Sequence, residues 1–170
     1  MKKFIVCLAL LALELGPLGA GTSQSVLVSA SVPDIFSIET STASVAFAFV
    51  EADYDAARLA SKSVAGAHNL LVRSNRPWVV SFRSTTSAFG FTPLRGGADP
   101  AKPTTALSVR TGGAPFVAVT TSDQVLKTGK AGSVHAAGNT FPVDYHLASD
   151  LNSDTPGFYS LTVTYTVSTP

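Results

Sequence analysis

The chain has 170 residues, of which 12 are basic and 11 acidic, and it contains a single cysteine, Cys7. This near balance of charge excludes the basic patch that nucleic acid or anionic lipid would require. The length fits one domain that buries its own hydrophobic core.

The N-terminal stretch has the pattern of a secretory signal peptide. Lys2 and Lys3 form a basic start, residues 4–13 are mostly apolar, and residues 16–20 are small or helix-breaking. We expect cleavage after Ala20, so that residues 1–20 are the signal peptide and residues 21–170 the secreted domain. Cys7 leaves with the signal, and the rest of the chain, with 10 basic and 10 acidic residues, folds without disulfides. No later segment has the length and apolarity of a membrane span, and the neutral surface favours self-association.

Short runs that alternate between apolar and polar or small residues recur along residues 21–170. This period of two predicts β-strands, and their spacing is typical of a β-sandwich. The runs, in chain order, are residues 26–32, 45–49, 70–72, 78–82, 107–109, 116–119, 141–147 and 158–167. Residues 84–104 and 127–140, rich in Gly, Ser, Thr and Pro, are expected to be long surface connections. We predict a single Ig-like antiparallel β-sandwich of roughly eight strands.

Trp78, the only tryptophan, shares a face of its predicted strand with Val80 and Phe82. One interpretation is an aromatic platform for a sugar ring. The other, which we favour, is the buried tryptophan around which a sandwich core packs. Tyr54 is a second candidate contact for a glycan.

The sequence contains no Gly-x-Ser-x-Gly, His-Glu-x-x-His or phosphate-binding glycine motif. Its histidines, His68, His135 and His146, are far apart in the chain. We therefore expect no enzymatic activity, no cofactor and no catalytic metal site.

Two stretches carry oxygen ligands at alternate positions, as the first half of a calcium loop does. These are Glu51, Asp53 and Asp55 in one stretch and Asp150, Asn152 and Asp154 in the other. The second stretch has Thr155 in place of the loop glycine and Leu161 in place of the bidentate glutamate. In loops that border strands, Asp and Asn usually make turns, and calcium binding stays an open alternative at both places.

The most regular alternation is at the C-terminal end. Its apolar positions, spaced by two, are Tyr159, Leu161, Val163, Tyr165 and Val167. The residues between them are mostly Ser and Thr, so this strand should lie half buried on an antiparallel sheet. The turn at residues 154–157 and Tyr159 after it match a tyrosine corner, in which the tyrosine hydroxyl bonds to upstream backbone.

The run from Gly157 to Val167, GFYSLTVTYTV, resembles the terminal strand of secreted pilin-like sandwiches. These are the spore coat U and Csu-type subunits and, more distantly, the chaperone–usher pilins. The shared features are the Gly-x-Tyr start, the alternation, and a glycine fourteenth from the C-terminus. The penultimate tyrosine of the chaperone–usher pilins and the cysteines of the coat U group are absent. The resemblance implies a structural subunit of a surface fibre, pilus or coat.

In a complete Ig-type sandwich another strand follows the tyrosine-corner strand, whereas here only Ser168, Thr169 and Pro170 follow Val167. The terminal strand should therefore leave an edge unpaired and accept a strand of another chain by β-augmentation. The candidate acceptor is the row from Tyr159 to Val167. The candidate donated segment is residues 25–32, in which Val26, Val28, Ala30 and Val32 alternate. Alternatively, this segment closes its own sheet.

The leading hypothesis is a non-enzymatic extracellular structural protein at the cell surface, which associates with identical or related subunits. The second is a monomeric cell-surface module that binds glycan or cell wall through Trp78 or Tyr54. The third is a secreted hydrolase of unfamiliar type.

Overall fold

The computed structural model describes residues 26–132 and 138–170. The chain divides into two units, Met1–Val32 and Pro33–Pro170. In the first unit, residues 26–32 belong to no strand, and Val26 and Val28 are 85% and 86% exposed. The predicted signal peptide and Ser25 lie outside the described residues.

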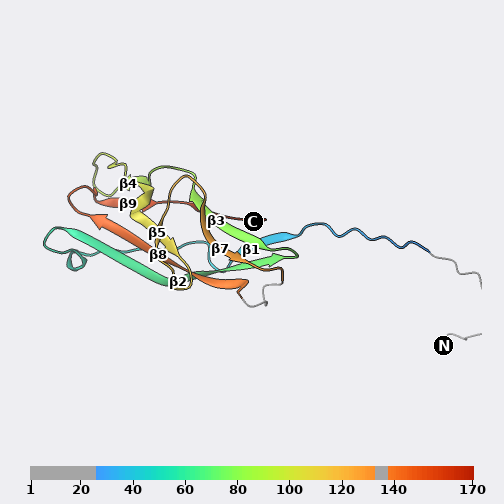
Figure 1. The fold of residues 1–170 in the computed structure, drawn as a ribbon. Coiled ribbons are helices and arrows are strands. Elements are labelled where there is room, and N and C mark those ends of the chain that lie inside the picture. Colours follow the sequence, from blue (N-terminus) through green and yellow to red (C-terminus); the bar gives the residue numbers. More distant parts are fainter. Residues whose placement is uncertain (1–25, 133–137) are drawn as a thin grey trace, which may run out of the picture. The chain divides into compact units, whose positions relative to one another are not determined.

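The second unit is built from β-strands (Figure 1). Its strands are β1 (Phe36–Thr40), β2 (Leu59–Ser74), β3 (Trp78–Ser84), β4 (Gly90–Pro93), β5 (Leu107–Arg110), β6 (Val117–Ala118), β7 (Gln124–Gly129), β8 (Thr140–Asp150), β9 (Gly157–Ser160) and β10 (Val163–Ser168). The only helical elements in the described ranges are two single-turn 3-10 helices, η1 (Glu51–Asp53) and η2 (Thr104–Ala106). None of the described residues forms a helix long and apolar enough to cross a membrane.

The strands form three antiparallel sheets. The largest has the order β1-β2-β8-β5-β6, the second has the order β10-β3-β7, and the smallest is the pair β4-β9. The predicted all-β antiparallel sandwich is thus confirmed, with ten described strands rather than roughly eight. β1, β4 and β7 correspond to none of the predicted runs. β4 lies inside the predicted connection 84–104, and the last three residues of β7, 127–129, lie inside the predicted connection 127–140, so both connections are shorter than expected.

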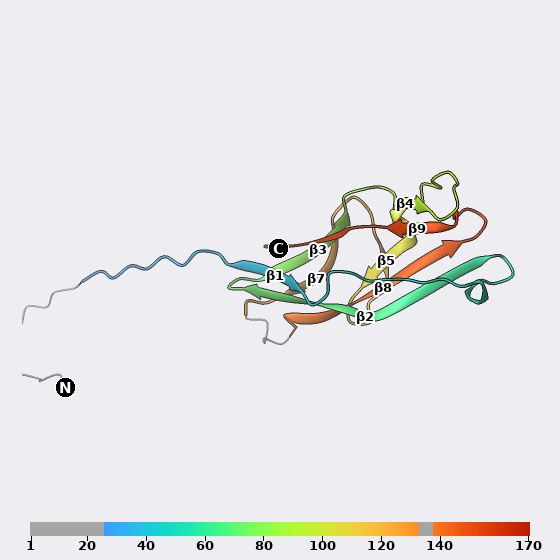
Figure 2. The same ribbon diagram turned by 180° about the vertical axis from the view of Figure 1, so that it is seen from behind.

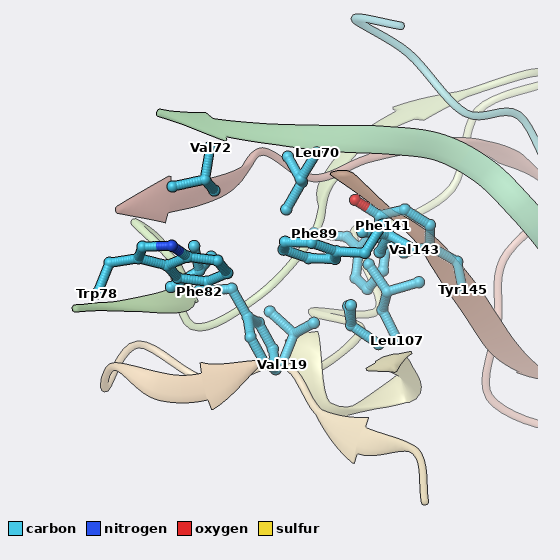
Figure 3. Close-up of a cluster of buried hydrophobic side chains, with 12 residues drawn as sticks. Leu70, Val72, Trp78, Phe82, Phe89, Leu107, Val119, Phe141, Val143 and Tyr145 are labelled. Atoms are coloured by element: carbon cyan, nitrogen blue, oxygen red, sulfur yellow. The ribbon is translucent and has the colours of Figure 1, made fainter. Parts of the chain in front are cut away.

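The core lies between the inner faces of the sheets (Figure 3). Trp78, Val80 and Phe82 project inward from β3, and each is 0% exposed. The Trp78 ring stacks on Phe141 of β8, with centroids 6.0 Å apart and planes 12° apart. Its indole N–H donates to the carbonyl oxygen of Lys130 at 2.9 Å. Gly129 lies opposite, where a Cβ atom would stand 2.1 Å from the indole ring, so a larger residue would displace the ring.

Trp78 is therefore the buried centre of the core. The alternative interpretation of Trp78 as a sugar platform is wrong, because a ring without solvent exposure has no face to offer a ligand. Tyr54 is half buried, and its hydroxyl is hydrogen-bonded to the Ser149 hydroxyl at 2.9 Å.

Replacing Trp78 with alanine should cost roughly 3–5 kcal/mol of unfolding free energy, because a large cavity would remain in the core. That is a large share of the roughly 5–15 kcal/mol total of a typical domain. Phe158→Ala is the control, since Phe158 is 68% exposed and surface changes usually stay within about 0.5 kcal/mol. Denaturant midpoints measure both changes. Equal midpoints for Trp78→Ala and wild type would contradict the assignment of Trp78 to the core.

Candidate functional site: two unpaired edges over the core

The predicted tyrosine corner is present. The hydroxyl of Tyr159 donates to the carbonyl oxygen of Thr155 at 2.7 Å, and its ring packs on Phe91 of β4 with centroids 5.0 Å apart. This bond ties the start of β9 to the turn before it, as in Ig-type sandwiches.

The predicted continuous strand over residues 158–167 is divided into two. β9 pairs with β4 and β10 pairs with β3, and Leu161 and Thr162 separate them. The alternation continues through the break, because the chain changes its hydrogen-bonding partner without turning its side chains to the other face. Period-two alternation reports only the buried face, so it could not reveal this change of sheet.

The five acceptor residues predicted from the sequence share one property, which is partial burial against the core. They are Tyr159, Leu161, Val163, Tyr165 and Val167. On the neighbouring strand β3, their cross-strand partners Phe82 (opposite Tyr165) and Val80 (opposite Val167) are completely buried. β3 and the chain from Tyr159 to Val167 therefore present apolar side chains to the same core. Those of β3 are completely buried, whereas those of residues 159–167 remain partly exposed to solvent.

The missing cover coincides with a missing backbone partner. In the described chain, β10 is paired only with β3, which leaves its other edge without a strand. β1 approaches β10 closely but is hydrogen-bonded only to β2. The sheet thus ends at β10 with a row of backbone N–H and C=O groups open to another chain.

A second extended segment has the same two properties. Residues 43–49 join β1 to η1, and Val45 and Phe47 pack against the core. Within residues 26–132 and 138–170 no backbone N–H from 43 to 49 has a hydrogen-bond partner. Lys62 of β2 holds the segment by donating to the carbonyl oxygen of Ala48 at 2.6 Å. In Figure 2 the chain after β1 runs as an extended trace that is not drawn as a strand.

We call residues 43–49 and Val163–Ser168 the unpaired edges. The alternation over residues 45–49 correctly predicted extended backbone, but the described chain supplies no strand to pair with it. Residues 26–32, the candidate donated segment, likewise pair with no strand among the described residues.

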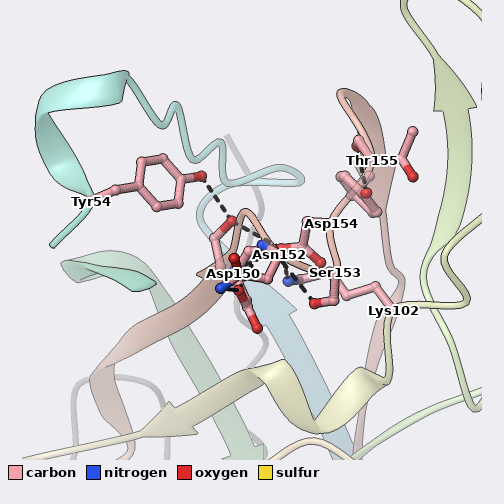
Figure 4. A network of polar contacts seen from close by, with 9 residues as sticks. Tyr54, Lys102, Asp150, Asn152, Ser153, Asp154 and Thr155 are labelled. Atoms are coloured by element: carbon pink, nitrogen blue, oxygen red, sulfur yellow. Dashed lines mark hydrogen bonds and ion pairs between the residues drawn. The ribbon is translucent and has the colours of Figure 1, made fainter. Parts of the chain in front are cut away.

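The loop after β8 uses its oxygen atoms for internal hydrogen bonds (Figure 4). The Asp154 carboxylate accepts from the Lys102 ammonium at 2.5 Å, from the Ser149 hydroxyl at 2.9 Å and from the Asp150 N–H at 3.0 Å. Asp150 accepts from the backbone N–H of Asn152 at 2.8 Å and from its side-chain amide at 2.9 Å. These residues make a turn, as Asp and Asn usually do beside strands.

The stretch Glu51, Asp53 and Asp55 is used in the same way. Asp53 forms an ion pair with Lys62 at 2.6 Å and accepts from the Val50 N–H at 2.7 Å. Asp55 accepts from the Leu59 N–H at 2.9 Å. Among the described residues, no cluster of three or more His, Cys, Asp or Glu side chains is arranged to hold a metal ion.

Asp154 was named from the sequence, but its buried ion pair with Lys102 was missed. The Lys102 and Asp154 side chains are only 7% and 11% exposed, and nothing in the sequence connects residues that lie 52 positions apart. His68, which is 5% exposed, did carry a signal, because it precedes Leu70 and Val72 at the same spacing of two.

The pKa of Asp154 reflects this environment. Burial alone would raise the pKa, but the hydrogen bonds from Lys102, the Asp150 N–H and Ser149 outweigh burial and lower it. A carboxyl group with a lowered folded-state pKa contributes stability above its unfolded value of about 3.9. That contribution is lost as the pH falls through the folded-state pKa.

Lys102→Met should cost about 3 kcal/mol, because it leaves the Asp154 carboxylate buried without its cation. Asp154→Asn should also destabilise the domain, and the double variant should lose less than the sum of the two. Arg73→Met is the control, because the 2.7 Å pair of Arg73 with Glu39 is about half exposed and such pairs contribute at most about 1 kcal/mol. Denaturant unfolding at neutral pH measures all four proteins. Additive losses would mean that Lys102 and Asp154 act independently.

The comparisons with known proteins add no family. No protein-family model matches the chain, and no curated protein is detectably similar to it. A functional proposal therefore rests on the unpaired edges and on the chemistry of the residues around them.

Proposed function

We propose that this protein is a non-enzymatic structural subunit of an extracellular fibre, pilus or coat, and that its subunits join by strand donation. Residues 25–32 of one copy lie along β10 of the next copy and pair with its unpaired edge. The observation that carries the proposal is a difference in burial between neighbouring strands. Tyr159, Leu161, Val163, Tyr165 and Val167 are only partly buried, whereas Phe82 and Val80 of β3, opposite Tyr165 and Val167, are completely buried.

Hydrophobic cover is the first supporting argument. An added strand beside β10 would bury the exposed parts of Val163, Tyr165 and Val167, together with its own inward side chains. Complete burial of one valine contributes roughly 1.5 kcal/mol or more. The domain has no disulfide, so its stability depends on hydrophobic burial alone. The burial that an added strand supplies is therefore a larger share of the total stability than in a disulfide-bonded domain.

Backbone pairing is the second supporting argument. The outer edge of β10 and residues 43–49 pack against the same core and both lack strand partners in the described chain. Lys62, on the inward-facing, even-numbered side of β2, fixes the second edge over that core. One strand placed between them would meet hydrogen-bonding groups on both sides, which is the β-augmentation mode of recognition.

The third argument concerns the occupant. Val26, Val28, Ala30 and Val32 alternate with Leu27, Ser29 and Ser31, so one face of the segment is apolar. Val26, Val28 and Val32 are between 76% and 86% exposed, and residues 26–32 belong to none of the described strands. Neither it nor β10 carries a charge, so nothing electrostatic opposes their pairing.

The processed chain, residues 21–170, should form oligomers that dissociate slowly. Unboiled samples should run as a ladder in detergent gels and boiled samples as one band. Deleting residues 21–32 should leave only monomers, soluble or held by a chaperone, because each joint would lack its donated strand. A ladder that survives the deletion would show that the joint lies elsewhere.

Single substitutions test the strand geometry. Val28→Asp places a charge on the inward face of the donated segment and should abolish the ladder. Leu27→Asp, one position earlier, places the same charge on the outward face and should leave the ladder largely intact, because strand neighbours point to opposite sides. Equal effects of the two variants would contradict pairing as a β-strand.

The competing hypothesis has a distinct outcome. If the processed chain stays monomeric at high concentration, strand donation is wrong and the monomeric glycan- or cell-wall-binding module becomes the leading hypothesis. Since Trp78 is buried, the candidate contact that remains is Tyr54, and Tyr54→Ala should then reduce binding to purified cell wall.

A further inference from the structure

His68 joins the two main sheets through an aromatic contact. It lies on β2, and its ring is 5.5 Å from that of Tyr145 on β8 and 5.6 Å from that of Tyr165 on β10. The hydroxyls of the two tyrosines are hydrogen-bonded to each other at 2.7 Å. His68, Tyr145 and Tyr165 thus connect the first sheet directly to the unpaired strand β10.

A bulge in β2 precedes His68. Val64 lies opposite Tyr145 and His68 lies opposite Val143. β2 therefore advances by four residues where β8 advances by two, which means that the bulge inserts two extra residues into β2. Gly66 in the bulge has a φ of 57°, which favours glycine, and its N–H donates to Asp144 at 2.8 Å. Because two extra residues preserve the alternation, His68 still faces the core with Leu70 and Val72.

The imidazole has an enclosed atom without a partner. His68 is 5% exposed, and its Nε2 atom has no hydrogen-bond partner in the described chain. An apolar side chain would fill this place without the cost of an unsatisfied polar atom. A histidine here is therefore not explained by packing alone.

No carboxylate of the described residues forms a hydrogen bond or ion pair with the His68 ring. The titratable groups packed on it are the phenols of Tyr145 and Tyr165. Asp144 is bound to Gly66 and Arg110, Lys62 further along β2 pairs with Asp53, and residues 43–49 contain no titratable side chain. Burial lowers the pKa of His68, and no neighbouring charge offsets this.

We propose that His68 is an acid sensor that loosens β10 from the rest of the domain when it becomes protonated. The imidazolium needs water or an acceptor for both N–H groups, and its surroundings supply no counter-charge. The least covered side of the cluster is β10, where Tyr165 is only half buried. Hydration of the charged ring therefore requires β10 to move outward.

The direction in which pH changes the stability of the domain follows from which state, folded or unfolded, binds the proton more tightly at His68. With a folded-state pKa below the unfolded value of about 6.5, the domain is most stable above that pH and loses stability as the pH falls below it. The effect on assembly rests on the proposed function. A donated strand on β10 would bury His68 further. The joint would then weaken up to tenfold per pH unit in this window, because one proton binds on release.

The loosening is tested without any joint, on processed chain whose donation is blocked by Val28→Asp. We expect the hydrogen-exchange protection of β10 amides, corrected for intrinsic rates, to fall up to tenfold per pH unit between pH 6.5 and pH 5. In the same protein carrying His68→Phe it should stay nearly constant, and His146→Gln, on the other face of β8, should behave as the parent. If His68→Phe fails to fold, His68→Gln takes its place with the same expectation. An equal fall with and without His68 would overturn the proposal.

The consequence for assembly is measured separately. Ladders of wild-type oligomers should dissociate faster at pH 5 than at pH 7.5, and His68→Phe ladders should dissociate at the same rate at both. Loosening of β10 without any ladder would contradict strand donation but leave the acid sensor intact. Ladders whose dissociation is equally fast at both pH values would overturn the link between His68 and the joint.

Discussion

Every extended segment of this domain has to hide one row of side chains and also pair its backbone, and no disulfide relieves either requirement. β2 and β8 meet both along most of their length, because they pair with each other and cover the core from one side. β3 meets both from the other side, between β10 and β7. The unpaired edges meet neither requirement completely, because their inward side chains are only partly buried and their backbone lacks a strand partner among the described residues.

The polar interactions of the domain hold these edges in position. The buried pair of Lys102 and Asp154 fixes the loop from which β9 starts, and the bond from Tyr159 to Thr155 fixes the start of β9 itself. At the other end of this path, Tyr165 contacts Tyr145 and His68 across the sandwich. β10 is thus anchored through side chains on its inward face while its outer backbone edge stays open. If β10 accepts a strand as proposed, this preorganisation would reduce the conformational entropy lost when the partner binds.

The sequence predicted the elements whose signal is local. Trp78, Val80 and Phe82 alternate within five residues, and they form the centre of the core as expected. What depends on residues far apart in the chain was not accessible. The four-residue β4 is a strand only because β9 lies beside it, and Lys102 is stably buried only because Asp154 faces it. The two sheets that share residues 157–168 were indistinguishable for the same reason, since alternation records the buried face and not the hydrogen-bonding partner.

The two alternating runs without partners, residues 26–32 and 45–49, bear most directly on function. Sheet edges that remain in water are usually blunted by charges, proline or bulges, and β7 follows this rule with Lys127, whose ammonium lies 4.5 Å from the centre of the Phe141 ring. Residues 43–49 and 163–168 contain no charged residue and no proline. Edges left so unprotected are a liability in a domain that works alone, because they invite indiscriminate pairing. In a domain that paired with a specific strand, as proposed for this one, the same edges would be the binding site, and Val26, Val28 and Val32 give the same sequence an alternating apolar segment of matching character.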